Sequence, residues 1–229
     1  NMKFGVVIFP GSNCDHDMIY TLETIMGHEV ERLWHKDSNL PDIDAIALPG
    51  GFTYGDYLRP GALARYSPIM QEVIRFANSG RPVFGICNGF QILCEAGLLS
   101  GVLLPNLSRK FICKNQYILP DNPKTAFTSK VGTKPLNIPI AHGEGRFYAD
   151  DNTLNEIEEN GQVLFRYCDE KGRISDDSNP NGSVNFIAGI CNKQKNVYGM
   201  MPHPERAADA ELGNTDGFNI LESFVRWFE

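Results

Sequence analysis

The sequence predicts an α/β fold built on an open, mostly parallel sheet between helices, with an added antiparallel hairpin region. Short apolar runs alternate with helical patterns through the first hundred residues, which is typical of successive β-α-β units. After residue 136, four apolar runs follow one another through turn-rich links, which favours antiparallel hairpins. The chain has 229 residues, and we expect one domain over residues 2–229, with Asn1 as a tag remnant.

The first half of the chain predicts strands and helices in the order β-α-β-β-α-β-α. Each expected strand is a short apolar run that stops at a turn-forming residue, and each expected helix carries apolar residues at a helical period. Pro68, directly after Ser67, is typical of a first helical position. The expected strands are 3–9, 28–34, 44–48 and 82–86, and the expected helices are 15–26, 68–78 and 88–99.

The second half predicts strands linked by tight turns and then a closing helix. The segment 106–134 has no clear period, and we interpret it as an extended flap. The expected strands are 136–141, 162–168, 184–191 and 197–201, and the closing helix is 215–228.

Composition excludes several classes of protein. Lys and Arg number 21 against 28 Asp and Glu, and this net charge of −7 argues against binding to a nucleic-acid backbone. No apolar run approaches the ~18 residues of a membrane span, and no charged-then-apolar leader opens the chain. The six cysteines form no C-x-x-C pair, so we expect free thiols, no metal site and a cytoplasmic protein.

A candidate nucleophile lies between an expected strand and an expected helix. The string Gly85-Ile86-Cys87-Asn88-Gly89 places Cys87 on a sharp turn, and small neighbours allow such a turn to bend tightly. A thiolate there is stabilised by the positive end of the helix dipole. The alternative is a tight structural turn, and Cys94, two helical turns further on, is expected in the core.

A thiol needs a base to react near neutral pH, and the base needs a group that orients it. A histidine followed two residues later by a carboxylate supplies both, and three such strings occur: His35-Lys36-Asp37, His142-Gly143-Glu144 and His203-Pro204-Glu205. His35 lies in a charged stretch and is expected in a solvated loop. His142 and His203 both follow apolar strands, where sites gather in α/β sheets, and their spacing does not separate them.

Acyl transfer also needs donors for the oxyanion. The backbone N–H of Asn88, one residue after Cys87, is the expected first donor, and Gly51 after the expected strand 44–48 allows a second N–H to approach a substrate closely. A plain turn at Pro49-Gly50-Gly51 is the alternative.

Four strings together resemble one family along the whole chain. They are P-G-G-F-T-Y-G-D-Y-L-R-P-G (49–61), G-I-C-N-G-F-Q (85–91), H-G-E-G-R-F (142–147) and M-P-H-P-E-R (201–206). The chain resembles the triad (class I) glutamine amidotransferases, whose fold is flavodoxin-like. The elbow and the His-Pro-Glu string are common to that superfamily, whereas the 49–61 and 142–147 strings resemble the branch that serves de novo purine biosynthesis.

The resemblance implies a role for each matching residue. Cys87 would attack the side-chain amide of glutamine and form a glutamyl thioester, His203 would act as acid and base, and Glu205 would orient His203. Gly51 and Asn88 would supply the oxyanion hole. The residues implied in the glutamine pocket are Gln91, Phe52, Tyr54 and Arg59. The resemblance thus favours His203 over His142, and leaves the 142–147 string to support the pocket or contact a partner.

The resemblance also implies partners. The ammonia would pass to a separate synthetase subunit, which would use ATP and Mg to make formylglycinamidine ribonucleotide, and a small bridging subunit is expected. No cofactor is expected in this chain. The alternatives are another amidotransferase branch, a Cys hydrolase of γ-glutamyl bonds, a thiol-based chaperone or deglycase that needs Cys87 alone, and a regulatory pseudoenzyme. The presence of Cys87, His203 and Glu205 together argues against the last.

Overall fold

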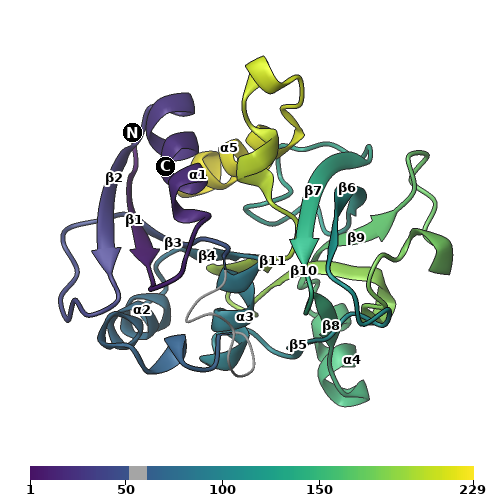
Figure 1. The fold of residues 1–229 in the computed structure, drawn as a ribbon, viewed down its shortest axis with the longest axis horizontal. Coiled ribbons are helices and arrows are strands. Elements are labelled where there is room, and N and C mark those ends of the chain that lie inside the picture. The colour runs from purple at the N-terminus through teal and green to yellow at the C-terminus, as the bar shows by residue number, and fades with distance from the viewer. Residues whose placement is uncertain (52–60) are drawn as a thin grey trace.

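A nine-stranded mixed sheet forms the centre of the molecule, in a computed structural model that describes residues 1–51 and 61–229 (Figure 1). The strand order is β2-β1-β3-β4-β11-β10-β9-β6-β7. Helices α1 and α5 cover one face of the sheet, and α2 and α3 cover the other (Figure 1). The predicted α/β class is therefore confirmed.

Five neighbouring strands run parallel and make up what we call the parallel half. They are β1 (Lys3–Ile8), β2 (Glu29–Trp34), β3 (Ala45–Leu48), β4 (Val83–Ile86) and β11 (Val197–Met200). Every residue of β3, β4 and β11 is buried, as expected for strands covered on both faces. Because their carboxyl ends meet at one edge, the segments that follow these three strands converge there.

The helices largely follow the expected ranges. The bounds are α1 (Asp15–Tyr20), α2 (Pro68–Asn78), α3 (Asn88–Glu95), α4 (Asp151–Glu159) and α5 (Asp216–Phe228). The expected helix 15–26 changes after Tyr20 into a π-helical turn over Thr21–Ile25, and the expected helix 88–99 ends at Glu95. Helix α4 was not predicted, because Ile157 is its one buried residue and gives no apolar stripe. None of the described helices is both long and apolar enough to cross a bilayer.

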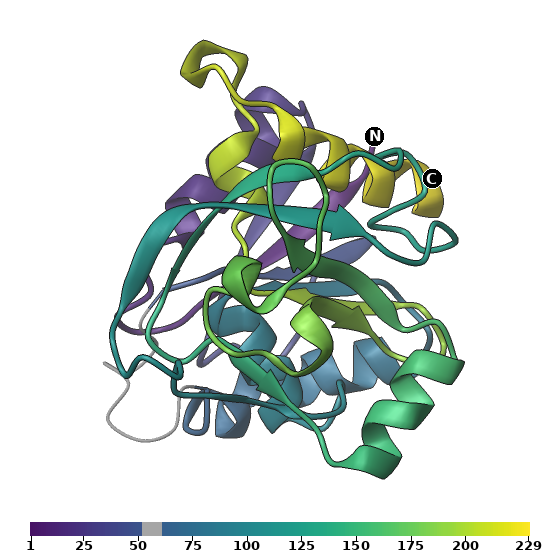
Figure 2. The same cartoon turned by 90° about the vertical axis from the view of Figure 1, so that its right-hand side faces the viewer.

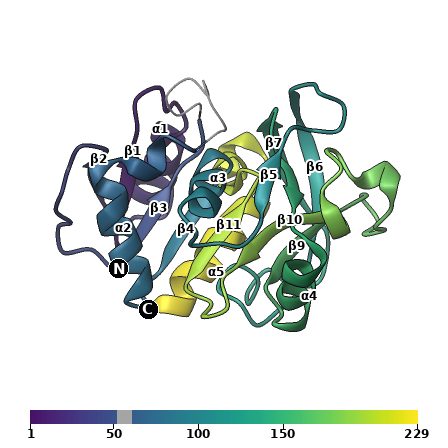
Figure 3. The same cartoon turned by 90° about the horizontal axis from the view of Figure 1, so that it is seen from below.

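The other four strands make up the antiparallel half, which Figure 2 turns toward the viewer. They are β6 (Ile112–Pro120), β7 (Leu136–His142), β9 (Val163–Cys168) and β10 (Ile187–Cys191). A separate two-stranded sheet pairs β5 (Val102–Leu104) with β8 (Arg146–Tyr148). Seen from below, α2 and α3 lie across the parallel half, while α4 lies beside the antiparallel half (Figure 3).

The interpretation of 106–134 as an extended flap is wrong. Strand β6 from this segment pairs with both β7 and β9 inside the main sheet. Three consecutive polar residues, Lys114-Asn115-Gln116, interrupt the apolar residues of β6. Gln116 is buried, and its amide donates to three backbone carbonyls. Phe127, later in the segment, is fully buried, with its ring 5.7 Å from that of Phe224 on α5. A buried polar residue inside the strand hid the apolar pattern.

The expected strand 184–191 begins only at Ile187. Asn185 and Phe186 have φ values of 49° and 60°, which a strand does not contain.

Candidate active site

Cys87 lies on the elbow between β4 and α3, in a backbone conformation that side chains rarely adopt. Its φ is 55° and its ψ is −108°. The glycines on either side make the bend possible, since a Cβ on Gly85 would lie 2.5 Å from the Gly89 carbonyl oxygen. A Cβ on Gly89 would lie 2.0 Å from the Leu48 carbonyl oxygen. The elbow therefore requires glycine at positions 85 and 89, and it also requires a strand before Cys87 and a helix after it.

His203 and Glu205 follow β11 and form a buried pair. His203 Nδ1 lies 2.6 Å from Glu205 Oε1, and the two side chains are 1% and 0% exposed. A 3₁₀ turn over Pro204–Ala207, with proline at its first position, brings Glu205 back under the imidazole. A Cβ on Gly50 would lie 2.7 Å from His203 Cε1 and 3.3 Å from Cys87 Cβ, so imidazole and thiol are neighbours.

The surroundings of His203 favour its charged form. Burial lowers the pKa of an imidazole, but here the negative charge of Glu205 and the nearby Cys87 outweigh burial and raise the pKa of His203 to about 10. At neutral pH His203 can therefore be an imidazolium next to the Cys87 sulfur. This is the arrangement that makes a cysteine a nucleophile.

The two candidate oxyanion donors lie in the loop after β3 and at the start of α3. Gly51 has a φ of 131°, and a Cβ there would lie 2.9 Å from the backbone nitrogen of Asn13. Asn88 begins α3, where helices direct their first N–H groups toward the preceding turn. Its buried side chain donates to Gln91 Oε1 at 2.9 Å. Both residues stay predicted donors, now at positions that flank Cys87.

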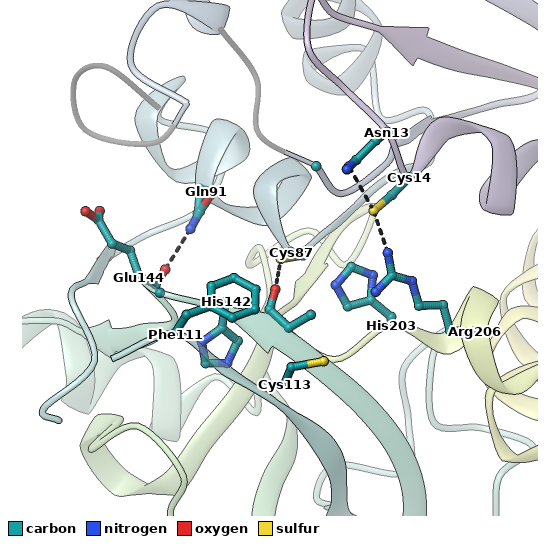
Figure 4. Close-up of a pocket in the computed structure, with 13 residues that line it drawn as sticks. Asn13, Cys14, Cys87, Gln91, Phe111, Cys113, His142, Glu144, His203 and Arg206 are labelled. Atoms are coloured by element: carbon teal, nitrogen blue, oxygen red, sulfur yellow. Dashed lines mark hydrogen bonds between the residues drawn. The ribbon is translucent and has the colours of Figure 1, made fainter. Parts of the chain in front are cut away.

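A cavity of about 380 Å³ opens in front of Cys87 and is lined by four of the predicted site residues (Figure 4). Cys87, His203, Gly51 and Gln91 line it, together with His142, Gly143 and Glu144. Phe52, Tyr54 and Arg59 lie outside the described residues. The sequence analysis missed six residues that line the cavity: Asn13, Cys14, Phe111, Cys113, Ala141 and Arg206. The volume is within the usual range for small-molecule sites.

Among the missed residues, Arg206 carried a signal, since it ends the string M-P-H-P-E-R. Its Nη2 donates to Cys14 Sγ at 2.8 Å, and its Nε lies 3.4 Å from Asp17 Oδ2. Burial raises the pKa of Cys14 to about 12 despite this guanidinium. Cys14 is therefore a neutral thiol in the cavity wall, unlike a reactive cysteine.

His142 lines the same cavity, but both of its ring nitrogens contact amides. Nδ1 lies 3.2 Å from Asn106 Oδ1, and Nε2 lies 3.4 Å from Asn181 Nδ2. Burial, and to a smaller extent the charge of His203, lower the pKa of His142 to about 4. The Glu144 carboxylate points away from the His142 ring (Figure 4). The geometry therefore separates two histidines that sequence spacing alone could not.

The free edge of β7, the last strand of the sheet, also reaches the site. Residues that face one edge of a strand alternate with those that face the other. Asn137 donates its N–H to Asp216 Oδ2 at 2.8 Å, the Pro139 carbonyl accepts the His203 N–H at 2.8 Å, and the Ala141 carbonyl accepts from Cys87 Sγ at 3.6 Å. Pro139 has no N–H, so at this residue the edge offers only a carbonyl to the His203 backbone.

No three His, Cys, Asp or Glu side chains of residues 1–51 and 61–229 gather in a way that could hold a metal ion.

Comparison with known proteins identifies the family of this chain. Residues 1–221 match the family model of the CobB/CobQ-like glutamine amidotransferase domain. The phosphoribosylformylglycinamidine synthase subunit PurQ of Salinibacter ruber is 52% identical, over 97% of this chain and 95% of its own length. PurQ of Moorella thermoacetica is 53% identical, over 100% of this chain and 97% of its own length.

Solved structures that resemble this chain include related proteins. PurLQS from Thermotoga maritima superposes with a TM-score of 0.87 at 42% identity, covering 100% of this chain and 99% of that one. A glutamine amidotransferase from Thermotoga maritima, 15% identical with a TM-score of 0.59, covers 98% of this chain and 90% of its own and shares the fold. This chain belongs to the CobB/CobQ-like glutamine amidotransferase family.

Proposed function

We propose that this chain is the glutamine-hydrolysing subunit of a phosphoribosylformylglycinamidine synthase, an enzyme of de novo purine biosynthesis. The carrying observation is Cys87 on a strained elbow beside the buried His203–Glu205 pair, at the wall of one cavity. Relatives of that name match this chain and their own sequences nearly end to end.

The first half of the reaction releases ammonia. The Cys87 thiolate attacks the side-chain amide carbon of glutamine, and the carbonyl oxygen takes up negative charge. The backbone N–H groups of Gly51 and Asn88 stabilise that charge, and one such donor is typically worth about 3 kcal/mol. The His203 imidazolium gives its proton to the departing nitrogen, the C–N bond breaks, and a glutamyl thioester remains on Cys87.

The second half restores the enzyme. His203, now neutral, takes a proton from water, and the hydroxide attacks the thioester. The C–S bond breaks, glutamate leaves and the Cys87 thiolate returns. Glu205 keeps Nδ1 of His203 protonated and oriented through the 2.6 Å contact, and it offsets the imidazolium charge.

The ammonia has a second destination in this proposal. A synthetase subunit would use it with ATP and Mg to form the amidine, and a small third subunit would bridge the two. The structural relative from Thermotoga maritima is PurLQS, which supports an assembly of this kind. This chain would need no cofactor of its own. We place it in the cytoplasm, and its six cysteines, all within the described residues, are free thiols.

Ammonia release from glutamine tests the proposal directly. Wild type and Cys87→Ser are assayed with and without the synthetase subunit, ATP and formylglycinamide ribonucleotide. Turnover that requires Cys87 and rises with the partner is the expected result. No turnover under any of these conditions would remove the amidotransferase function and return Cys87 to the hydrolase or chaperone alternatives.

A further inference from the structure

His142 is fixed by two side-chain amides whose own orientations are settled by other bonds. Asn106 Nδ2 donates to the carbonyls of Lys110 and His142, both at 2.9 Å, so Oδ1 is the atom that faces the ring. That Oδ1 also accepts the Gly145 N–H at 3.1 Å. Asn181 Nδ2 donates to the Gly145 carbonyl at 2.9 Å, while its Oδ1 accepts from Ser183 Oγ at 2.7 Å.

These orientations assign the tautomer of His142. An acceptor, Asn106 Oδ1, faces Nδ1, so Nδ1 carries the proton and donates it. A donor, Asn181 Nδ2, faces Nε2, so Nε2 is unprotonated. A second proton on the ring would point at an N–H₂ group. The geometry thus agrees with the lowered pKa of His142 and leaves the ring no proton to give to a substrate.

The clamped ring supports one wall of the cavity. A Cβ on Gly145 would lie 2.4 Å from His142 Nδ1, so the turn after the histidine packs directly on the imidazole. Asn106 and Asn181 bind the N–H and the carbonyl of that same glycine. One residue earlier, the Glu144 carbonyl accepts from Gln91 Nε2 at 2.6 Å, which ties the turn to α3 behind the elbow. Gly143 and Glu144 line the cavity.

We propose that His142, clamped between Asn106 and Asn181, is a positioning residue that sets the shape of the glutamine pocket through the Gly143–Gly145 turn and Gln91. It acts on substrate binding and leaves the chemistry of Cys87 and His203 unchanged. This inference rests on the proposed glutaminase function. It gives the 142–147 string a role distinct from that of the similar string at 203–205.

The test compares variants that keep or remove the two ring bonds. His142→Phe fills the space with no hydrogen bond, while His142→Asn keeps a donor close to Nδ1 for Asn106. We expect His142→Phe to raise KM for glutamine about tenfold or more, with kcat within about threefold of wild type. Alkylation of Cys87 by iodoacetamide should keep its wild-type rate, and His142→Asn should recover most of the KM.

A matched control separates positioning from general loss of stability. Asn196 is also a buried amide that donates to two carbonyls, those of Ala77 and Arg81, but it lies at the opposite end of β11 from His203. Asn196→Ala should lower stability and leave KM unchanged. If His142→Phe does not fold, Asn181→Leu removes the Nε2 contact together with the bonds of Asn181 to Gly145, Tyr167 and Ser183, and should raise KM in the same way.

An unchanged KM in His142→Phe or Asn181→Leu would overturn the inference, as would a matching loss of kcat and of Cys87 alkylation. His142→Asn behaving like His142→Phe would also contradict it. Wild type that fails to hydrolyse glutamine would instead remove the proposed function itself.

Discussion

The 203–205 and 142–144 segments carry the same His-x-Glu pattern, lie in the wall of the same cavity, and have opposite electrostatics. Both histidines are buried, at 1% and 3% exposure. The pKa of His203 is raised to about 10, whereas the pKa of His142 is lowered to about 4. The sequence string does not set this difference. The groups that reach each ring do: a carboxylate at His203 and two neutral amides at His142.

The backbone path after each histidine differs at the residue between histidine and glutamate. Pro204 starts a 3₁₀ turn that brings the Glu205 carboxylate to its own histidine. Gly143 starts no such turn, and the Glu144 carboxylate points away while its backbone carbonyl binds Gln91. Asn106 and Asn181 then approach His142 from distant parts of the chain. The neighbours of a buried histidine in space therefore decide whether it acts as a base or only positions other residues.

The largest effect should come from deleting each ring in turn. His203→Ala removes the proton donor and acceptor, so glutamine hydrolysis should fall by about 1,000-fold or more. His142→Ala should keep measurable chemistry, because the ring has no free proton to transfer. Steady-state ammonia release measures both. Equal and total loss in the two variants would break the distinction.

Removing the carboxylate partner of His203 should make the two rings more alike. Glu205→Gln deletes the negative charge that outweighs burial, so the pKa of His203 should fall from about 10. Hydrolysis should drop by about 1,000-fold, as in triads that lose their orienting acid. NMR titration of the His203 ring protons follows the pKa. A pKa that stays near the wild-type value would show that Glu205 does not set the charge.

A side chain placed between Cys87 and His203 should have an intermediate effect on kcat. Gly50→Ala places a methyl group 2.7 Å from His203 Cε1, which displaces the ring and should lower kcat about 100-fold. Gly5→Ala is the control, because its Cβ meets Leu33 Cδ1 at 2.6 Å in the core, remote from the site. That variant should lose stability and keep kcat. Comparable kcat in the two variants would argue against close packing at Cys87.

The two rings should also respond oppositely to pH in unfolding. Below the unfolded pKa of 6.5, the unfolded chain protonates His142 before the folded protein does, so folding stability falls as pH drops toward 4. That difference amounts to about 3 kcal/mol. The raised pKa of His203 stabilises the fold fully below pH 6.5, and this contribution is lost as pH rises toward 10. Urea unfolding from pH 4 to 7, wild type against His142→Asn, measures the first. Parallel curves would contradict it.

The smallest effect is expected at a second thiol of the cavity. Cys113 on β6 pairs in register with Ala141, and it is the Ala141 carbonyl that contacts Cys87. Cys113→Ser should therefore change kcat/KM by less than about twofold, the usual result at an exposed position. Cys87→Ser should abolish turnover. A large loss of kcat/KM in Cys113→Ser would contradict this prediction and show that β6 takes part in the reaction.

The reactive side of the cavity was predictable because it depends on local geometry. The elbow needs glycines at 85 and 89 between a strand and a helix, and each of these is visible in a few residues. Glu205 was predictable for the same reason, since its partner is two residues away. Phe52, Tyr54 and Arg59 stay predictions.

The opposite wall could not be predicted, because it depends on contacts between distant segments. Asn106 and Asn181 lie 36 and 39 residues from His142, in segments with no motif. The contacts of β7 with His203 and Cys87 use backbone carbonyls, which any residue supplies. Among these contacts only Pro139 has a signal in the sequence, since proline in a strand indicates an edge strand. The position of β6 between β7 and β9 likewise has no local signature.

The edge of β7 also limits how this protein can change during evolution. Its contacts with α5, His203 and Cys87 come from residues 137, 139 and 141, at the two-residue repeat of a strand. Side-chain substitutions there leave the carbonyls in place. Insertion or deletion of one residue within β7 turns the carbonyls that follow it toward β6 and away from the catalytic pair. Lineages should therefore tolerate substitutions at residues 137, 139 and 141 more readily than single-residue length changes in this strand.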